Sequence, residues 1–257
     1  MEVIHPIRPM WNVRQMTKRM RADQLLVQRG LAESRARAQA AIKTGLVSVD
    51  GVTVEKPSQP LSIEAELKAS PAHPYVSRGG TKLAAGLDHF RIDPKDEICL
   101  DMGASTGGFT DVLINRGAKR VYAVDVGRAQ LHASLRGRSG IVSLEETDAR
   151  ALDRKLVPEP IDLVVADVSF ISLKLVLPAA FKLASPHAKL IALIKPQFEA
   201  GRDKTRKGIV RDEAVHVAVC KDIENFIVER GWNVVGVMPS PIEGGDGNRE
   251  FLIYAAT

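Results

Sequence analysis

The sequence predicts an α/β protein in which a mostly parallel sheet carries helices on both faces and follows a small α+β domain. Two observations predict the sheet: strand and helix patterns alternate beyond Pro94, and a glycine-rich turn follows the first of these strands. The small domain is predicted by a compact helix, helix and hairpin pattern over residues 20–66. We therefore divide the chain into an extension over 1–19, the small domain, a linker over 67–76 and a main domain over 77–257.

The composition argues against several classes of protein. Hydrophobic residues make up 45% of the chain and charged residues 26%, which is typical of a soluble globular protein rather than a disordered one. No window approaches the ~18 apolar residues of a membrane span, and the first residues lack the apolar core of a secretory signal. Cys99 and Cys220 have no C-x-x-C partner or histidine cluster, so neither a disulfide framework nor a cysteine-based zinc site is expected. We expect a cytoplasmic protein with no membrane and no metal partner.

Positive charge is concentrated in the first third of the chain. The first 90 residues hold 13 Lys and Arg against 8 Asp and Glu, whereas the other residues hold 23 of each kind. Such a split is typical of a basic module attached to a neutral one, and nucleic acid is the usual partner of the basic part. A solvated charged face gives the same count, so charge alone leaves both interpretations open.

The small domain is predicted to contain, in order, a helix, a second helix and a hairpin. The first helix ends at Gly30, and the second begins after the capping residue Ser34 and ends at Gly45. The segment V-S-V-D-G-V-T-V then alternates as two strands across the Asp50-Gly51 turn, which is a strong hairpin signal.

This arrangement resembles the RNA-binding domain shared with ribosomal protein S-four. The residues that carry the resemblance are Arg21, Asp23, Leu25, Leu26, Ser34, Arg35, Ala38, Ile42, Gly45, Val47, Val49, Gly51 and Val54. In such domains the second helix and the hairpin present cations to folded RNA, and phosphate contacts supply affinity without reading sequence. The resemblance implies RNA contacts by Arg21, Arg35, Arg37 and Lys43.

The main domain is predicted to alternate strands and helices. Strands are expected at Glu97–Met102, Arg120–Val126, Ile141–Leu144, Ile161–Val168, Lys189–Lys195, Trp232–Met238 and Arg249–Tyr254. Helices are expected after the Gly79-Gly80 turn and at Gly108–Arg116, Ala129–Gly137, Leu173–Ala184 and Asp212–Arg230. The last two strands are joined like a hairpin by P-S-P-I-E-G-G-D-G-N, so one antiparallel edge strand is expected.

The first strand of this domain, E-I-C-L-D-M, leads into G-A-S-T-G-G-F-T-D, a pattern typical of a nucleotide-cofactor loop. It is not an NTPase phosphate loop, and Gly103, Gly107 and Gly108 do not have the G-x-G-x-x-G spacing. Asp125 ends the next strand, where a carboxylate can accept hydrogen bonds from both hydroxyls of a ribose. S-adenosylmethionine fits best, because its carboxylate suits the N–H groups of the loop and its ammonium suits Asp101.

The expected cofactor site extends to the end of the third strand. Its residues are Asp101, Gly103, Ser105, Thr106, Gly107, Gly108, Phe109, Asp125 and Asp148. Asp148 lies where the adenine amino group would be met, although strand-end capping is the ordinary alternative for each of these aspartates. Phe109 and Phe170 are expected in the core rather than as platforms for base stacking.

Six motifs resemble the TlyA family of bacterial ribosomal-RNA 2′-O-methyltransferases, some of which are known historically as haemolysins. They are, in chain order, Y-V-S-R-G-G-T-K-L, D-M-G-A-S-T-G-G-F-T-D, V-Y-A-V-D-V-G, D-V-S-F-I-S-L, L-I-K-P-Q-F-E and G-N-R-E-F-L, and the resemblance as a whole covers about Met20 to Ala255. The resemblance implies a Rossmann-like S-adenosylmethionine-dependent methyltransferase sheet and a cytidine ribose of ribosomal RNA as the target. The catalytic half is similar to the FtsJ type, whose Lys-Asp-Lys-Glu tetrad falls on Lys82, Asp167, Lys195 and Glu250.

This tetrad suits the removal of a proton from a ribose hydroxyl. A lysine can accept that proton only as a neutral amine, which burial and a second nearby cation favour. Lys195 follows the apolar run L-I-A-L-I, and Lys82 would supply the second cation. We assign Lys195 as the general base, Asp167 as the residue nearest the transferred methyl group, and both acids as groups that orient the amines.

A cationic segment, E-A-G-R-D-K-T-R-K-G-I-V-R, follows Lys195 closely. It is expected to act as a lid that holds RNA phosphates beside the active site, through Arg202, Lys204, Arg206 and Lys207. A mobile solvated loop is the ordinary alternative. Arg78, before the Gly-Gly turn, is also expected to contact RNA.

Two other functions stay open from the sequence. One is an RNA-binding assembly factor whose methyltransferase fold no longer turns over, and the other is a membrane-active haemolysin. The intact tetrad argues against the first, and the lack of an apolar span or a cationic amphipathic helix with aromatics argues against the second. The expected partner is ribosomal RNA or a ribosomal subunit, and the oligomeric state is left open.

Overall fold

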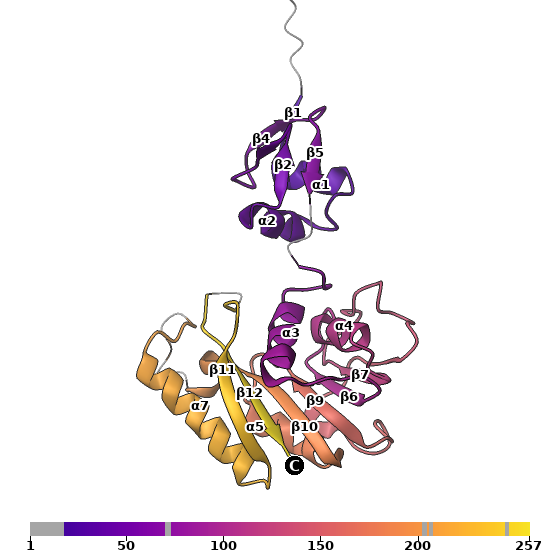
Figure 1. The fold of residues 1–257 in the computed structure, drawn as a ribbon, viewed down its shortest axis with the longest axis vertical. Coiled ribbons are helices and arrows are strands. Elements are labelled where there is room, and N and C mark those ends of the chain that lie inside the picture. The colour runs from indigo at the N-terminus through magenta and orange to yellow at the C-terminus, as the bar shows by residue number, and fades with distance from the viewer. Residues whose placement is uncertain (1–17, 70–72, 202–204, 206–207, 245–246) are drawn as a thin grey trace, which may run out of the picture. The chain divides into compact units, whose positions relative to one another are not determined.

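The computed structural model in Figure 1 describes residues 18–69, 73–201, 205, 208–244 and 247–257. It divides the chain into two compact units, Met1–Pro74 and Tyr75–Thr257.

The first unit forms two small sheets and two helices over its described residues. The elements are β1 (Arg19–Arg21), α1 (Ala22–Gln28), α2 (Arg35–Lys43), β2 (Val47–Val49), β3 (Val52–Thr53), β4 (Pro60–Ser62) and β5 (Leu67–Ala69). β1 pairs with β4, and β2 lies between β3 and β5, all in antiparallel register. The strands β1, β4 and β5 were not predicted, because an alternation over three residues is too short to stand out.

The predicted helices and hairpin of this unit are confirmed. The Ser34 hydroxyl accepts a hydrogen bond from the Arg37 backbone N–H at 3.3 Å and so caps α2. Asp50 and Gly51 both have positive φ angles, as the tight hairpin turn between β2 and β3 requires. Buried aliphatic side chains from both helices and β2 form the core, including Leu25, Leu26, Ile42 and Val47.

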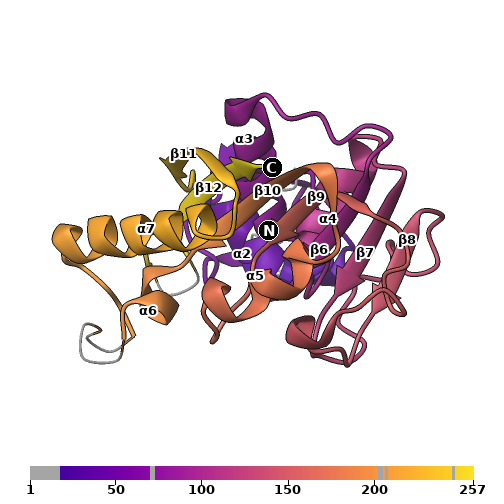
Figure 2. The same ribbon diagram turned by 90° about the horizontal axis from the view of Figure 1, so that it is seen from below.

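The second unit is built on one seven-stranded sheet (Figures 1 and 2). Its elements are α3 (Gly79–Phe90), β6 (Ile98–Met102), α4 (Gly108–Asn115), β7 (Arg120–Val124), β8 (Ile141–Leu144), the 3-10 helix η1 (Ala149–Ala151), β9 (Ile161–Ala166), α5 (Leu173–Phe181), β10 (Ala184–Ile194), α6 (Pro196–Glu199), α7 (Glu213–Val228), β11 (Asn233–Pro239) and β12 (Phe251–Ala256). The strand order is β11-β12-β10-β9-β6-β7-β8.

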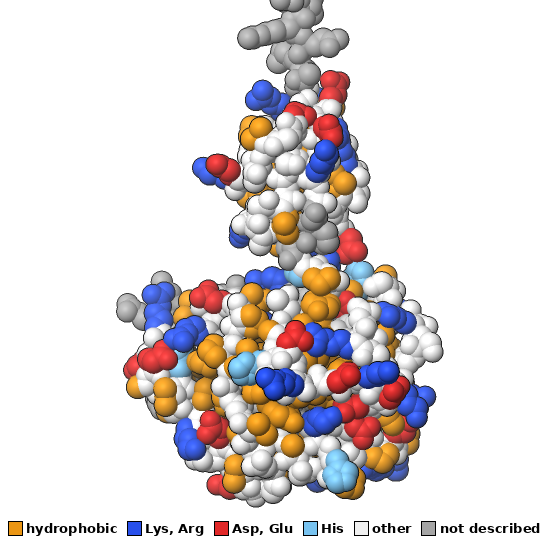
Figure 3. Space-filling model, viewed as in Figure 1, with side chains coloured by type: hydrophobic (Ala, Val, Ile, Leu, Met, Phe, Trp, Pro, Cys, Tyr) orange, Lys and Arg blue, Asp and Glu red, His pale blue; other side chains and the backbone are white. Residues whose placement is uncertain are grey.

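Helices cover both faces of this sheet, as predicted. Alternate residues of β10 point to opposite faces: Ile191 and Leu193 pack with α3 and α4, whereas Leu190 and Ala192 pack with α5 and α7. The strands β6 to β10 run parallel, so their carboxyl ends meet at one edge of the sheet. On the face of this unit seen in Figure 3, basic and acidic side chains are interspersed, in keeping with its balanced charge.

The predicted antiparallel edge strand is wrong in position. β12 is the strand that runs antiparallel, and it lies inside the sheet between β10 and β11. β11 forms the edge and runs in the direction of the parallel strands, since it is antiparallel to β12. The hairpin signal established the relative direction of two strands but could not establish which of them pairs with β10.

The predicted helix over Ala129–Gly137 is also wrong, because this segment forms turns. The Glu145 carboxylate accepts hydrogen bonds from three consecutive backbone N–H groups, those of Ala129, Gln130 and Leu131, at 2.7 to 3.0 Å. Ala129 has a positive φ of 52°, which a helix does not allow. A carboxylate distant in sequence therefore replaces the hydrogen bonds that a helix would have made.

Among the residues that the structure describes, no helix is both long enough and apolar enough to cross a bilayer.

Candidate active site

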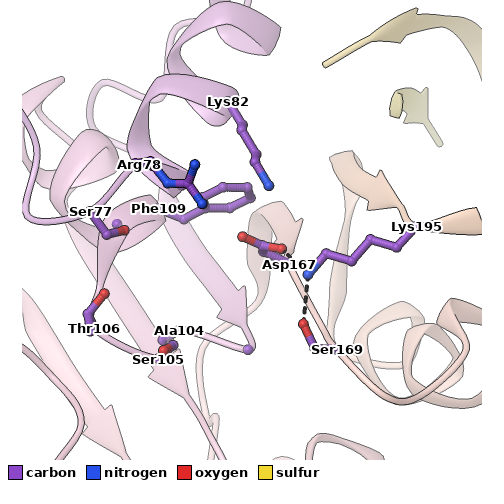
Figure 4. Close-up of a pocket in the computed structure, with 13 residues that line it drawn as sticks. Ser77, Arg78, Lys82, Ala104, Ser105, Thr106, Phe109, Asp167, Ser169 and Lys195 are labelled. Atoms are coloured by element: carbon purple, nitrogen blue, oxygen red, sulfur yellow. Dashed lines mark hydrogen bonds and ion pairs between the residues drawn. The ribbon is translucent and has the colours of Figure 1, made fainter. Parts of the chain in front are cut away.

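Two adjoining clefts lie at the carboxyl ends of the parallel strands, where ligands bind in open α/β sheets. The first, about 300 Å³, is lined by residues that include Ser77, Arg78, Lys82, Thr106, Phe109 and Lys195 (Figure 4). The second, about 380 Å³, reaches Asp125 and Asp148. Both clefts share Gly103, Ser105, Asp167 and Ser169, so one continuous site is formed.

The four residues of the predicted tetrad come together as two ion pairs. Lys82 of α3 lies 2.5 Å from Glu250, just before β12 (Nζ to Oε2). Lys195, directly after β10, lies 2.6 Å from Asp167, directly after β9 (Nζ to Oδ1). The two lysines are each 8% exposed and Glu250 is 4% exposed, so each charge is buried against an opposite one. Figure 4 shows Lys82 and Lys195 extending toward Asp167 from different sides of the first cleft.

Ser169 is a member of this site that sequence reasoning missed. The Lys195 amine donates a hydrogen bond to the Ser169 hydroxyl at 2.8 Å, in addition to its ion pair with Asp167. Ser169 follows Asp167 by two residues in D-V-S-F, and a serine that close to a tetrad residue was the available signal. Asp167 and Ser169, which line both clefts, together hold the Lys195 nitrogen at the wall of the first cleft.

The glycines of the loop after β6 permit close packing. A Cβ at Gly103 would lie 2.8 Å from the backbone oxygen of Asp167, and one at Gly108 would overlap the Ser77 hydroxyl. Gly107 lines neither cleft; its φ is +91°, and a Cβ there would overlap the side chains of Leu131 and Leu135. Gly103 and Gly108 thus let the loop approach its neighbours, whereas Gly107 has a structural role.

The Asp125 carboxylate organises the second cleft. It accepts hydrogen bonds from the backbone N–H groups of Ser105 at 2.8 Å and Gly127 at 2.7 Å. Asp148 lies in the same cleft, but its carboxylate is held by Arg150, whose guanidinium lowers the pKa of Asp148 to about 2. The apolar walls of this cleft include Val126, Ile171 and Val176.

Asp101 lies beneath the loop rather than at its surface. Its side chain is fully buried and lines neither cleft, so the structure does not bring it to the position expected for contact with an ammonium group. The Thr110 hydroxyl donates a hydrogen bond to one carboxylate oxygen at 2.6 Å, and the other oxygen has no hydrogen-bond partner among the described residues. Burial raises the pKa of Asp101 to about 7.

Asp101 predicts a specific dependence of stability on pH. The folded protein keeps this proton up to about pH 7, whereas the unfolded chain releases it near its ordinary value of 3.8. The contribution of Asp101 to the free energy of unfolding therefore falls between about pH 4 and pH 7, by at most about 1.4 kcal/mol per pH unit. Asp101→Asn removes this contribution, so its unfolding temperature should gain on that of the wild type between about pH 4 and pH 7 and change little relative to it above that range. Parallel calorimetric curves for the two proteins would contradict the prediction.

The predicted RNA-contacting residues fall into three groups. Arg78 is exposed and lines the first cleft, and Lys43 is exposed at the end of α2. Arg21, Arg35 and Arg37 each form an ion pair with a carboxylate of the first unit. Outside the described residues lie Arg202, Lys204, Arg206 and Lys207.

Phe109 is buried as expected, but the expectation that Phe170 belongs to the core is wrong. Phe170 is 90% exposed and has a positive φ of 64°, so the chain turns its ring out of the sheet directly after β9. The Phe198 ring lies beside it, with 5.0 Å between the ring centroids. Burial of Phe170 was predicted from its hydrophobicity alone. The backbone turn exposes its ring instead.

Among the described residues, no group of three or more His, Cys, Asp and Glu side chains is placed to hold a metal ion.

Comparisons with known proteins match both units. The family model described as FtsJ-like methyltransferase matches residues 75–257, and the S4 domain model matches residues 20–67. The chain is 43% identical over 245 residues to the Mycobacterium tuberculosis protein named 16S/23S rRNA (cytidine-2'-O)-methyltransferase TlyA, which covers 94% of this chain and 91% of that one. It is 39% identical to Hemolysin A of Brachyspira hyodysenteriae, over 91% of this chain and 99% of that one. A solved structure from Streptococcus thermophilus, described as a candidate hemolysin, has a TM-score of 0.74 and 41% identity over 94% of this chain and 89% of that one.

Proposed function

Because this chain belongs to the TlyA family of FtsJ-like methyltransferases, we propose that it methylates the 2′-hydroxyl of a cytidine ribose in ribosomal RNA. The observation that carries the proposal is the pairing of Lys82 with Glu250 and of Lys195 with Asp167 at the edge of the sheet where the parallel strands end. The relative from Mycobacterium tuberculosis is named for the same reaction.

The proposed cofactor is S-adenosylmethionine, which supplies an electrophilic methyl group when bound. The donor set of the second cleft fits its adenosine half. The Asp125 oxygens can accept hydrogen bonds from two ribose hydroxyls in addition to their backbone donors, because each oxygen has two lone pairs. Val126, Ile171 and Val176 offer an apolar surface to adenine. Gly103 lines both clefts, where the methionine end would follow the adenosine half, and its missing Cβ lets the loop pack on the Asp167 backbone.

In the proposed reaction Lys195 accepts the proton of the 2′-hydroxyl as the hydroxyl oxygen attacks the methyl carbon. Asp167 and Ser169 fix the Lys195 nitrogen at the wall of the first cleft. Lys195 accepts the hydroxyl proton only as a neutral amine, so it first gives one proton to solvent. Lys82, held by Glu250, places a positive charge beside the negative charge that develops on the ribose oxygen. Alignment of the hydroxyl with the methyl group contributes the rest of the rate.

The proposed partner is ribosomal RNA, alone or within a ribosomal subunit. The S4 domain over residues 20–67 and the excess of basic residues in the first third of the chain support RNA binding. Contacts of this kind release counterions from the phosphates, so the affinity for RNA should fall steeply as salt rises.

The test is methyl transfer from radiolabelled S-adenosylmethionine to ribosomal subunits and to naked ribosomal RNA that lack the modification. We expect label in RNA, resistance of one phosphodiester bond to alkaline cleavage, and a cytidine at that position. Absence of label from both subunits and both naked RNAs, or label on a base, would refute the proposed function.

A further inference from the structure

Asp23 is an ionisable residue that is completely buried in the small first unit. It lies in α1, and its carboxylate binds donors from two other elements. Arg21 of β1 binds both oxygens, at 2.9 Å through Nε and 3.0 Å through Nη2. Arg35 and Gln39 of α2 bind Oδ2 at 3.1 and 2.9 Å. The Arg21 guanidinium holds the pKa of Asp23 well below its usual range, so the carboxylate stays charged.

The two arginines bound to Asp23 keep donors for a further ligand. Arg21 uses Nε and Nη2, Arg35 uses one terminal nitrogen, and no described residue binds their other N–H groups. The two side chains are 42% and 54% exposed. Their Nη2 atoms are at most about 6 Å apart, because both lie about 3 Å from the same oxygen of Asp23. The charges of Arg21, Arg35 and Asp23 sum to one net positive charge, which faces solvent.

Another arginine of this unit shows what a purely structural role looks like. Arg29 donates from both terminal nitrogens to the backbone oxygens of Ile63 and Ala65, which attaches α1 to the segment after β4. Arg21 and Arg35 are bound to a buried anion instead, and their outer edges stay accessible.

We propose that Asp23 is a positioning residue for RNA binding, which holds Arg21 and Arg35 side by side as a preformed site for one backbone phosphate. The inference rests on the proposed function, since RNA is the ligand. Without the anion the two guanidinium groups would repel each other and would lose more freedom on binding. A phosphate offers the oxygen acceptors that planar guanidinium forks bind most strongly.

The test exploits the sign of the charge change. Asp23→Asn makes the protein more positive by one charge, which by long-range attraction alone would strengthen RNA binding. We expect instead that the full-length variant binds 23S ribosomal RNA about tenfold more weakly, with a shallower dependence on salt. Glu64→Gln is the matched control, because it adds the same charge at an exposed position of the same unit, and it should bind as tightly as the wild type or more tightly. Equal or tighter binding by Asp23→Asn would overturn the inference.

A second pair of variants separates positioning from stability and decides the question if Asp23→Asn does not fold. Arg35→Lys keeps the charge but loses the planar fork, so binding should weaken about tenfold. Gln39→Ala removes an uncharged donor to the same carboxylate, so it should lower the unfolding temperature yet retain most of the affinity. Wild-type affinity in Arg35→Lys would overturn the inference, and so would equal losses in both variants. Failure of the wild type to bind any ribosomal RNA would instead refute the proposed function itself.

Discussion

Lys195→Ala should nearly abolish methyl transfer to ribosomal RNA while leaving cofactor binding almost unchanged. Lys195 lines the first cleft and is bound to Asp167 and Ser169, whereas the proposed ribose contact, Asp125, lies in the second cleft. Loss of a general base typically lowers the rate by ~10²–10⁴-fold. Lys195→Arg should be comparably inactive, because a guanidinium keeps the ion pair with Asp167 but does not accept a proton at working pH.

The measurement is single-turnover methylation at saturating cofactor, together with a calorimetric titration of cofactor affinity. Lys189→Ala is the matched control: Lys189 lies on β10, the strand that Lys195 directly follows, but pairs with Glu97 and lines neither cleft. It should keep the wild-type rate of methyl transfer. Near-wild-type rates for Lys195→Ala would refute the mechanism even though the family assignment would stand.

Asp125→Ala should have the opposite profile and weaken S-adenosylmethionine binding by about 10²-fold. The substitution removes two acceptors for the ribose hydroxyls and also releases the backbone N–H groups of Ser105 and Gly127. The tetrad is untouched, so the single-turnover rate at saturating cofactor should be largely retained.

Asp148→Ala is the comparison for this prediction. Arg150 already occupies the Asp148 carboxylate in the same cleft, so its loss should weaken cofactor binding by less than about tenfold. Calorimetric dissociation constants for the two variants check the order. Wild-type cofactor affinity in Asp125→Ala would show that the ribose is bound elsewhere.

The fold class could be predicted because the hydrophobic periodicity of strands and helices, and the turn residues that end them, are local properties of the chain. Strands buried on both faces form short apolar runs, so β6, β7 and β9 were located from sequence to within two residues at either end. The Asp50-Gly51 hairpin was predicted for a similar reason, since few residues accept two consecutive positive φ angles.

The errors have a common origin in contacts between distant segments. The helix pattern near Ala129 is overridden by the Glu145 carboxylate, which lies beyond the next strand. β10 begins at Ala184, before the expected Lys189, because pairing with β9 and not hydrophobicity defines its start. Phe170 is exposed because a backbone turn at the end of β9 directs it outward.

In the tetrad, too, local sequence predicted one part and contacts between distant segments decided the other. Its four members were proposed from motifs, and the shared position of Asp167 and Lys195 was foreseeable because parallel strands end at one edge of the sheet. Which lysine pairs with which acid, the contact of Ser169 with Lys195, and the burial of Asp101 beneath the loop could not be predicted. Each depends on the distance between side chains that are far apart in sequence.

By itself, the sequence determined the alternating sheet, the basic small domain and the residue types available for methyl transfer, because these depend on local pattern and composition. Only the tertiary structure decided which charges are neutralised and which stay available. Lys195 is paired at the cleft wall, Arg29 is bound to backbone oxygens, and Arg21 and Arg35 are held outward by Asp23. The reason is physical: a charge pairs with whatever the fold places within about 4 Å, and the chain sequence does not record that distance.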